Sequence, residues 1–138
     1  MSLIDIHFTT DRFNLSVVDP TFINDCCFGE DLSRWLVTAL CQRGIEAAVI
    51  CMEDFGWANE ASYNGHTYLL CVAGASDEDS EHPNRGEWHI MLERKRTWLE
   101  VLQGKAKITP DDPVVQQVLA LLQAEGFAEL AVEGPHGS

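Results

Sequence analysis

The sequence lacks any apolar run long enough to cross a membrane. Its longest apolar stretches fall short of the ~20 residues that a membrane-spanning helix needs, so no such helix is predicted. A secretory signal is also missing, because residues 1–8 have neither a basic start nor a sufficiently long apolar segment, and the acidic Asp5 argues against a transit peptide. These absences predict a cytoplasmic location and no membrane partner.

Cysteine pairing and catalytic signatures are absent as well. The five cysteines are odd in number, and three of them lie inside apolar runs, where a thiol behaves as a small hydrophobic side chain. The sequence contains no CxxC, HExxH, GxSxG, P-loop or Rossmann glycine pattern. We therefore expect no disulfide, no metal and no cofactor, and a non-catalytic protein is favoured over an enzyme.

Basic residues are scarce. The chain has 9 Lys and Arg residues against 22 Asp and Glu residues, which gives a formal net charge of -13. This charge repels nucleic-acid phosphates and anionic lipids, and it favours basic protein partners or simply keeps the protein in solution. The one basic cluster, Arg94–Arg96, is interpreted as solvated charge at the end of a strand.

Length and composition are those of one globular domain. The chain has 138 residues, of which 46% are hydrophobic and 22% charged, and it contains no repeat or linker that would divide it. Residues 1–132 are predicted to form a single α+β domain, followed by a loose C-terminal tail at 133–138.

Apolar periodicity predicts two main helices. The first spans about 30–43, where five apolar residues share one face, acidic residues open the helix and Gly44 can end it. The second begins in the segment 109–113, with Thr109 as the expected cap, and stops at Gly126. A short helical turn is expected at 97–103, ending near Gly104.

Alternation of polar and apolar residues predicts the strands. They cover 3–9, 45–52, the two arms of a hairpin, a segment around Trp88, and 127–132. Residues 10–28 are expected to form an irregular arm with room for one short strand at 15–18.

The hairpin signal is the tetrapeptide 63–66, whose Asn-Gly pair suits a type I′ turn. A two-residue loop places Trp57 opposite Val72 and Ala61 opposite Tyr68 on one face. The other face of the hairpin collects small residues, and we expect a helix to pack closely against it.

These elements predict an α+β fold: a two-layer structure with a mostly antiparallel sheet and two main helices packed on one face. Three alternatives remain for the aromatic residues of the opposite face. They are solvated, covered by the arm at 10–28, or contacted by a partner, which includes a second copy in a homodimer.

Three short motifs resemble a group of small uncharacterised bacterial proteins. The motifs are FGEDL at 28–32, EDFGW at 53–57, and Trp88 in a late strand followed by ERKR at 93–96. The group carries an EDWGW-like turn, so Phe55 stands where it commonly has tryptophan. The resemblance implies a similar α+β fold and brings no activity, cofactor or catalytic residue.

Other candidate sites have simpler explanations. Asp77, Asp79 and Glu81 match the first positions of a calcium loop, but glycine and glutamate are missing from its later positions, and a solvated loop fits better. His66 and His89 have no partner at metal-ligand spacing and are interpreted as surface or hydrogen-bonded residues. Cys26–Cys27 precede a helix, but the adjacent acidic residues work against a thiolate.

Two functions remain. The favoured one is a non-catalytic acidic interaction module, such as an immunity-type inhibitor or an accessory subunit, which binds a basic partner through carboxylates and exposed aromatics. The alternative is a small-ligand-binding protein or minor enzyme, with a pocket between sheet and arm near Asp54 and Trp57. The candidate binding residues are Glu53, Asp54, Trp57, Tyr68 and Trp88, and no catalytic residue is assigned.

Overall fold

A computed structural model describes residues 3–13, 15, 28–53, 56–76, 81, 84–104 and 108–136. In chain order the elements are β1 (Leu3–Thr10), α1 (Glu30–Gln42), β2 (Glu46–Glu53), β3 (Gly56–Tyr63), β4 (His66–Ser76), β5 (Gly86–Arg94), α2 (Trp98–Gln103), α3 (Pro113–Glu125) and β6 (Ala128–His136). Among the described helices, none has the length and apolar character needed to cross a membrane.

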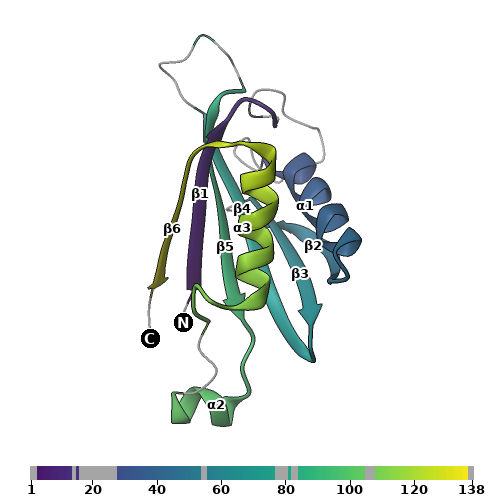
Figure 1. Cartoon of the computed structure of the whole chain (residues 1–138), viewed down its shortest axis with the longest axis vertical. Helices are drawn as coiled ribbons and strands as arrows, with labels where there is room; N and C mark the ends of the chain where they lie inside the picture. Colours follow the sequence, from purple (N-terminus) through teal and green to yellow (C-terminus); the bar gives the residue numbers. More distant parts are fainter. Residues whose placement is uncertain are drawn as a thin grey trace.

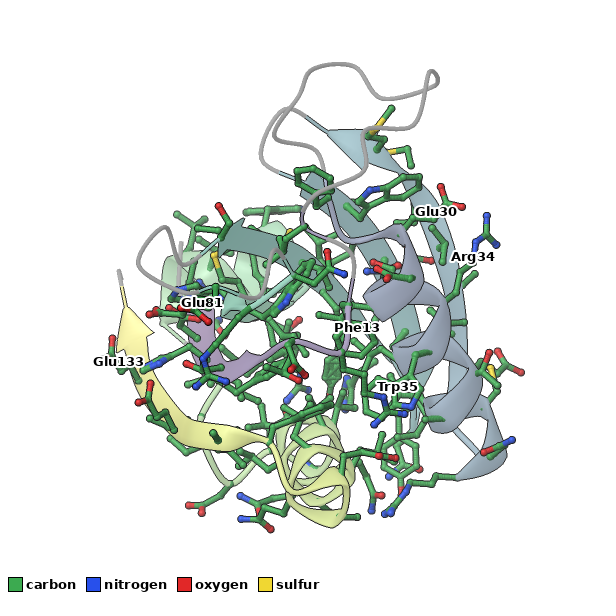
Figure 2. All side chains as sticks on the ribbon, turned by 90° about the horizontal axis from the view of Figure 1, so that it is seen from above. Phe13, Glu30, Arg34, Trp35, Glu81 and Glu133 are labelled. Atoms are coloured by element: carbon green, nitrogen blue, oxygen red, sulfur yellow. The ribbon has the colours of Figure 1, made fainter. Side chains whose placement is uncertain are left out.

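The strands form one six-stranded sheet in the order β2-β3-β4-β5-β1-β6, and every neighbouring pair is antiparallel. Both long helices, α1 and α3, lie on the same side of this sheet (Figures 1 and 2). The predicted two-layer α+β fold with two main helices on one face is therefore confirmed.

The hairpin turn follows the prediction from its Asn-Gly pair. Asn64 and Gly65 have φ angles of 51° and 77°, the positive values that a type I′ turn requires. The pairing is also as predicted, with Trp57 opposite Val72 and Ala61 opposite Tyr68.

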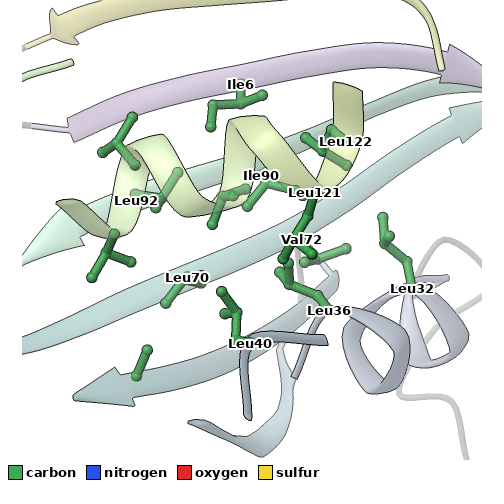
Figure 3. Packing of buried hydrophobic residues seen from close by; sticks show 14 of the residues in the cluster. Ile6, Leu32, Leu36, Leu40, Leu70, Val72, Ile90, Leu92, Leu121 and Leu122 are labelled. Atoms are coloured by element: carbon green, nitrogen blue, oxygen red, sulfur yellow. The ribbon is translucent and has the colours of Figure 1, made fainter. Parts of the chain in front are cut away.

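The helices cover the opposite side of this hairpin from the one expected. They pack against the large residues of the sheet, and no described helix lies over the face with the small side chains. Figure 3 shows Leu32, Leu36 and Leu40 of α1 directed toward the sheet. Burial of large apolar side chains removes more surface from water, and this outweighs the close approach that small residues permit. The aromatic residues expected on the free face are thus in the core.

Two buried polar contacts join the helices to the sheet. The Asn59 side-chain amide on β3 donates to Ser33 Oγ on α1 at 3.0 Å, and both residues are almost fully buried. The Tyr68 hydroxyl on β4 donates to Asp112 Oδ2 at 3.1 Å, just before α3. Each contact fixes one helix against one strand.

Asp112, and not Thr109, caps α3. Its Oδ1 accepts from the Val114 backbone N–H at 2.9 Å, so one carboxylate binds both the helix end and Tyr68. Thr109 was expected as the cap because Asp112 stands at its capping-box position and either proline suits the first turn. The helix instead begins at Pro113, so the cap is the residue before it.

Burial and the neighbouring Asp112 carboxylate raise the pKa of Tyr68 to about 12. The fold thus favours the protonated phenol. This stabilisation is complete below the ordinary tyrosine pKa of about 10 and is lost as the pH rises through the raised value.

The two ends of the chain differ from the prediction. β6 continues to His136, where it pairs with Leu3, so residues 133–136 belong to the sheet and not to a loose tail. The backbone of residues 133–136 pairs with the edge of the sheet along β1. The polar side chains of these residues do not indicate that pairing. In the arm, Phe13 and Leu15 are buried at 5% and 6% exposure, and most of the predicted short strand at 15–18 lies outside the described residues.

Replacing Tyr68 by phenylalanine is expected to lower the free energy of unfolding by about 1.5 to 3 kcal/mol, because a hydrogen bond to a charged acceptor is lost. Tyr63→Phe, at the half-buried end of the hairpin, is the matched control, with an expected change of about 0.5 kcal/mol or less. Urea unfolding followed by circular dichroism measures both values. Equal losses would show that the Tyr68–Asp112 contact contributes no specific stability.

Candidate interaction face

The predicted aromatic site residues are packed in the core. Trp57, Tyr68 and Trp88 are 8%, 1% and 0% exposed, and all three point to the helix-covered side. Glu53 is the last residue of β2, opposite Gly56, and Asp54 lies outside the described residues. The structure brings the three aromatics into one layer, with at most the rim of Trp57 at the surface.

The motif segments converge around Gly29. A Cβ atom on Gly29 would lie 3.2 Å from Trp57, 3.1 Å from Val72 and 3.5 Å from Trp88. Trp88 also needs glycine on its other side, because a Cβ on Gly74 would lie 2.6 Å from its ring. These residues therefore serve close packing between α1 and the sheet.

Cavities bounded by described residues lie elsewhere. One depression of about 410 Å³ is lined by residues at the end of β1 and the start of β6, including Arg12 and Phe127. A second of the same size lies beside the hairpin turn, next to Gly44 and Tyr63. Neither is lined by the aromatics of the predicted pocket.

One side of the sheet faces away from α1 and α3 and is not covered by a described helix. We call it the open face. It consists of the strand residues that alternate with the buried ones. Ala58 belongs to this row but is itself buried, at 5% exposure. The described members are Leu3, Asp5, His7, Thr9, Glu46, Ala48, Cys51, Ala58, Glu60, Ser62, Thr67, Leu69, Cys71, Ala73, Glu87, His89, Met91, Glu93, Ala131 and Glu133.

The strand register divides the open face into an apolar and a polar half. The apolar half lies over β2, β3 and β4 and extends to one residue of β5. We call it the apolar patch, and it comprises Ala48, Cys51, Ala58, Leu69, Cys71, Ala73 and Met91. Leu69, Cys71 and Met91 are only half-buried there, so apolar surface of the sheet centre remains in contact with water.

A cluster of two histidines and three carboxylates occupies the polar half. His7 and His89 face each other across β1 and β5, with ring centroids 5.4 Å apart. Both carboxylate oxygens of Asp5 lie 2.9 Å from His89 Nδ1, and Glu87 lies 2.8 Å from its Nε2. Glu133 on β6 lies 3.4 Å from His7 Nε2. We call these five residues the His–carboxylate cluster.

The carboxylates hold a proton on His89. Partial burial of the ring lowers its pKa, but hydrogen bonds and charge from Asp5 and Glu87 outweigh burial and raise the pKa above its ordinary value of 6.5. The charged imidazolium is thus favoured in the folded state. Its contribution to stability is complete below pH 6.5 and is lost as the pH rises through the raised value.

The cluster is arranged as hydrogen bonds between side chains. Within the described part of the chain, no three His, Cys, Asp or Glu side chains are placed to hold a metal ion. With both ring nitrogens of His89 facing carboxylates, the group is better suited to accept further donors than to act as a ligand shell.

Several basic side chains are already paired within the chain. Arg12 forms an ion pair with Glu125, Arg34 with Glu30 at 3.2 Å, and Lys95 with Glu60 at 2.8 Å. Such exposed pairs add little stability, but they neutralise cations that are scarce in this sequence. The negative excess therefore stays on the surface.

Sequence reasoning missed the open face as a site. The sequence signal that could have indicated it is a pair of i, i+2 spacings, Asp5-x-His7 in one strand and Glu87-x-His89 in another. Only the pairing of β1 with β5 brings the two repeats together, and that pairing joins residues more than 80 positions apart.

No protein-family model, curated protein or solved structure matches this chain. Function is therefore inferred from the geometry and charge of the open face.

Replacing Asp5 by asparagine is expected to lower the pKa of His89, because the substitution removes a negative charge at 2.9 Å and keeps the size of the side chain. Proton-detected NMR titration of the His89 ring measures the change. Glu93→Gln, which removes a carboxylate from β5 four residues after His89, is the control and should leave the pKa of His89 at its wild-type value. An unchanged value in the Asp5 variant would show that the carboxylate does not stabilise the imidazolium.

Proposed function

We propose that the protein is a non-catalytic, cytoplasmic interaction module whose open face binds a basic protein partner. The observation that carries this proposal is the uncovered sheet face, where half-buried apolar side chains lie beside a His–carboxylate cluster. An immunity-type inhibitor and an accessory subunit are both modules of this kind.

The size of the open face suits a protein partner. Six strands spaced about 4.8 Å apart and about eight residues long at 3.3 Å per residue give a flat area of roughly 600 Å². Side-chain relief raises the accessible area toward the ~800 Å² that one partner buries in a standard interface. A small molecule would bury little of itself on such a flat surface.

The charge of the open face favours a basic partner. Glu46 and Glu93 border the apolar patch on one side, where Glu60 is already paired with Lys95, and the His–carboxylate cluster borders it on the other. A partner with apolar side chains ringed by lysine or arginine would match this pattern. Electrostatic attraction would increase the association rate, and the apolar contact would slow dissociation.

The test compares two variants that remove the same charge from different sides. The open-face variant carries Asp5→Asn, Glu87→Gln and Glu133→Gln, and the control variant carries Glu30→Gln, Asp111→Asn and Glu125→Gln near the helices. Basic proteins captured from the source cell by the wild type are purified and measured by titration calorimetry. We expect the open-face variant to bind on the order of tenfold more weakly, or about 1.4 kcal/mol, and the control variant to bind like the wild type.

Circular dichroism first establishes that both variants are folded. Equal weakening in the two variants would mean that only net charge matters, which contradicts a specific open face. Binding should also fall as the salt concentration rises from 0.05 to about 0.5 M, because surface charges are then screened.

A further inference from the structure

Helix α2 presents its apolar side to water. Trp98 and Leu102 are 74% and 73% exposed, and Leu99 and Val101 are 50% and 51% exposed. None of the residues of α2 is buried. In Figure 1, α2 lies beyond the end of the sheet, apart from α1 and α3.

The apolar residues of α2 lie on one side of the helix, and its carboxylate lies on the other. At about 100° per residue, the four apolar residues span an arc of about 160°, and Glu100 lies opposite its centre. Hydrogen bonds from Thr97, together with the charges of Arg94 and His66 at the end of the sheet, lower the pKa of Glu100. A surface helix normally buries its apolar arc against the domain, but the apolar arc of α2 is exposed.

This helix is preformed despite its length of six residues. Thr97 and Glu100 form a reciprocal capping box, and Gly104 closes the helix in the left-handed conformation with φ 65°. The apolar side chains are thus held in place before any partner binds, which reduces the entropy lost on docking.

The stretch of sequence that contains α2 is basic in a chain that is otherwise acidic. Five of the nine Lys and Arg residues fall between positions 94 and 107, but only one of the 22 Asp and Glu residues does. Arg94, Lys95 and Arg96 directly precede the helix. An exposed apolar helix preceded by basic residues is complementary to an apolar patch with acidic residues at its border.

We infer that α2 of one copy docks on the open face of a second copy, with its apolar side chains on the apolar patch and Arg94–Arg96 toward the acidic border. This inference rests on the proposed function, since it makes a second copy one of the basic partners of the open face.

Reciprocal docking follows from the position of α2. The helix begins three residues after Lys95, which continues the open-face row of β5 and donates to Glu60 on β3. A two-fold axis near this end of the sheet would place each α2 over the other copy's face and close the assembly as a dimer. Two such contacts double the buried area, so the wild-type dimer should be tighter than a pair of copies held by one contact.

A lipid surface fits less well than a second copy. Outside positions 94–107 the chain has 21 Asp and Glu residues against four Lys and Arg residues, so an anionic membrane would repel most of the protein. The open face offers both the apolar contact and the opposite charge within the same chain.

The dimer would cover the open face, so self-association and binding of another basic partner would compete. We therefore expect the dimer to dissociate into monomers as a basic partner is added.

The experiment is a complementation test by sedimentation velocity across the micromolar range. The helix variant carries Trp98→Ser and Leu102→Ser, which replace exposed side chains and leave the core intact. The face variant carries Ala48→Lys and Leu69→Lys on the apolar patch. We expect the wild type to be dimeric, each variant alone to be monomeric, and an equimolar mixture to regain dimers, since one intact helix then meets one intact face.

A control variant, Val132→Ser, removes an exposed apolar side chain on β6, at the other edge of the sheet, and should stay dimeric. A monomeric wild type, a dimeric helix variant, or a mixture that remains monomeric would each overturn the inference. A face variant that is dimeric on its own would also overturn the inference, and it is the result expected if α2 simply paired with α2.

Failure of this inference is separable from failure of the proposed function. The helix variant keeps the His–carboxylate cluster and the apolar patch, so it should bind the captured basic partner at least as tightly as the wild type does. If the wild type is monomeric but the open-face variant still loses the partner, only the dimer is excluded.

Discussion

Two helices cover one face of a six-stranded sheet, and the organisation of the protein depends on this one-sided burial. The covered face holds the large side chains, from Ile6 on β1 to Leu70 on β4, and the helices are fixed there by Ser33–Asn59 and Tyr68–Asp112. The chain has no third long helix among its described residues to cover the other face. An antiparallel sheet tolerates this exposure, because its outward residues alternate with the buried ones and can be polar.

The fold was largely readable from the sequence because its signals are local. Alternation in residues 3–9 gave β1, apolar periodicity gave α1, and Asn64-Gly65 fixed the register of β3 with β4. The side on which the helices pack is not a local property. It depends on the total apolar area of each face, and the pairing of β1 with β5 adds Ile6 and Ile90 to the side of Trp57 and Val72. Without knowledge of that pairing, the face with the small residues of the hairpin was predicted to be the one on which a helix packs.

The candidate site was less readable for the same reason. Aromatic residues at a strand end suggested a binding pocket, but Tyr68 and Trp88 occupy the core that one-sided burial requires. The His–carboxylate cluster depends on contacts between residues 5 and 89, which no short motif reports. Helix α2 was predicted in position, and its apolar arc was recognised as exposed only from the structure, where Trp98 and Leu102 lie in water.

The distribution of charge connects these two surfaces. A chain with a net charge of -13 needs few cations for solubility, yet five of its nine Lys and Arg residues fall at positions 94–107, the stretch of sequence that contains the exposed apolar helix. Spread evenly, the same residues would reduce repulsion between carboxylates across the whole surface. Placed beside Trp98, they instead create a segment whose chemistry is opposite to that of the open face. Because both surfaces belong to one chain, every molecule carries a binding face and a segment whose chemistry suits that face. The affinity of α2 for the open face, relative to that of another protein, then decides whether the open face is available to that protein.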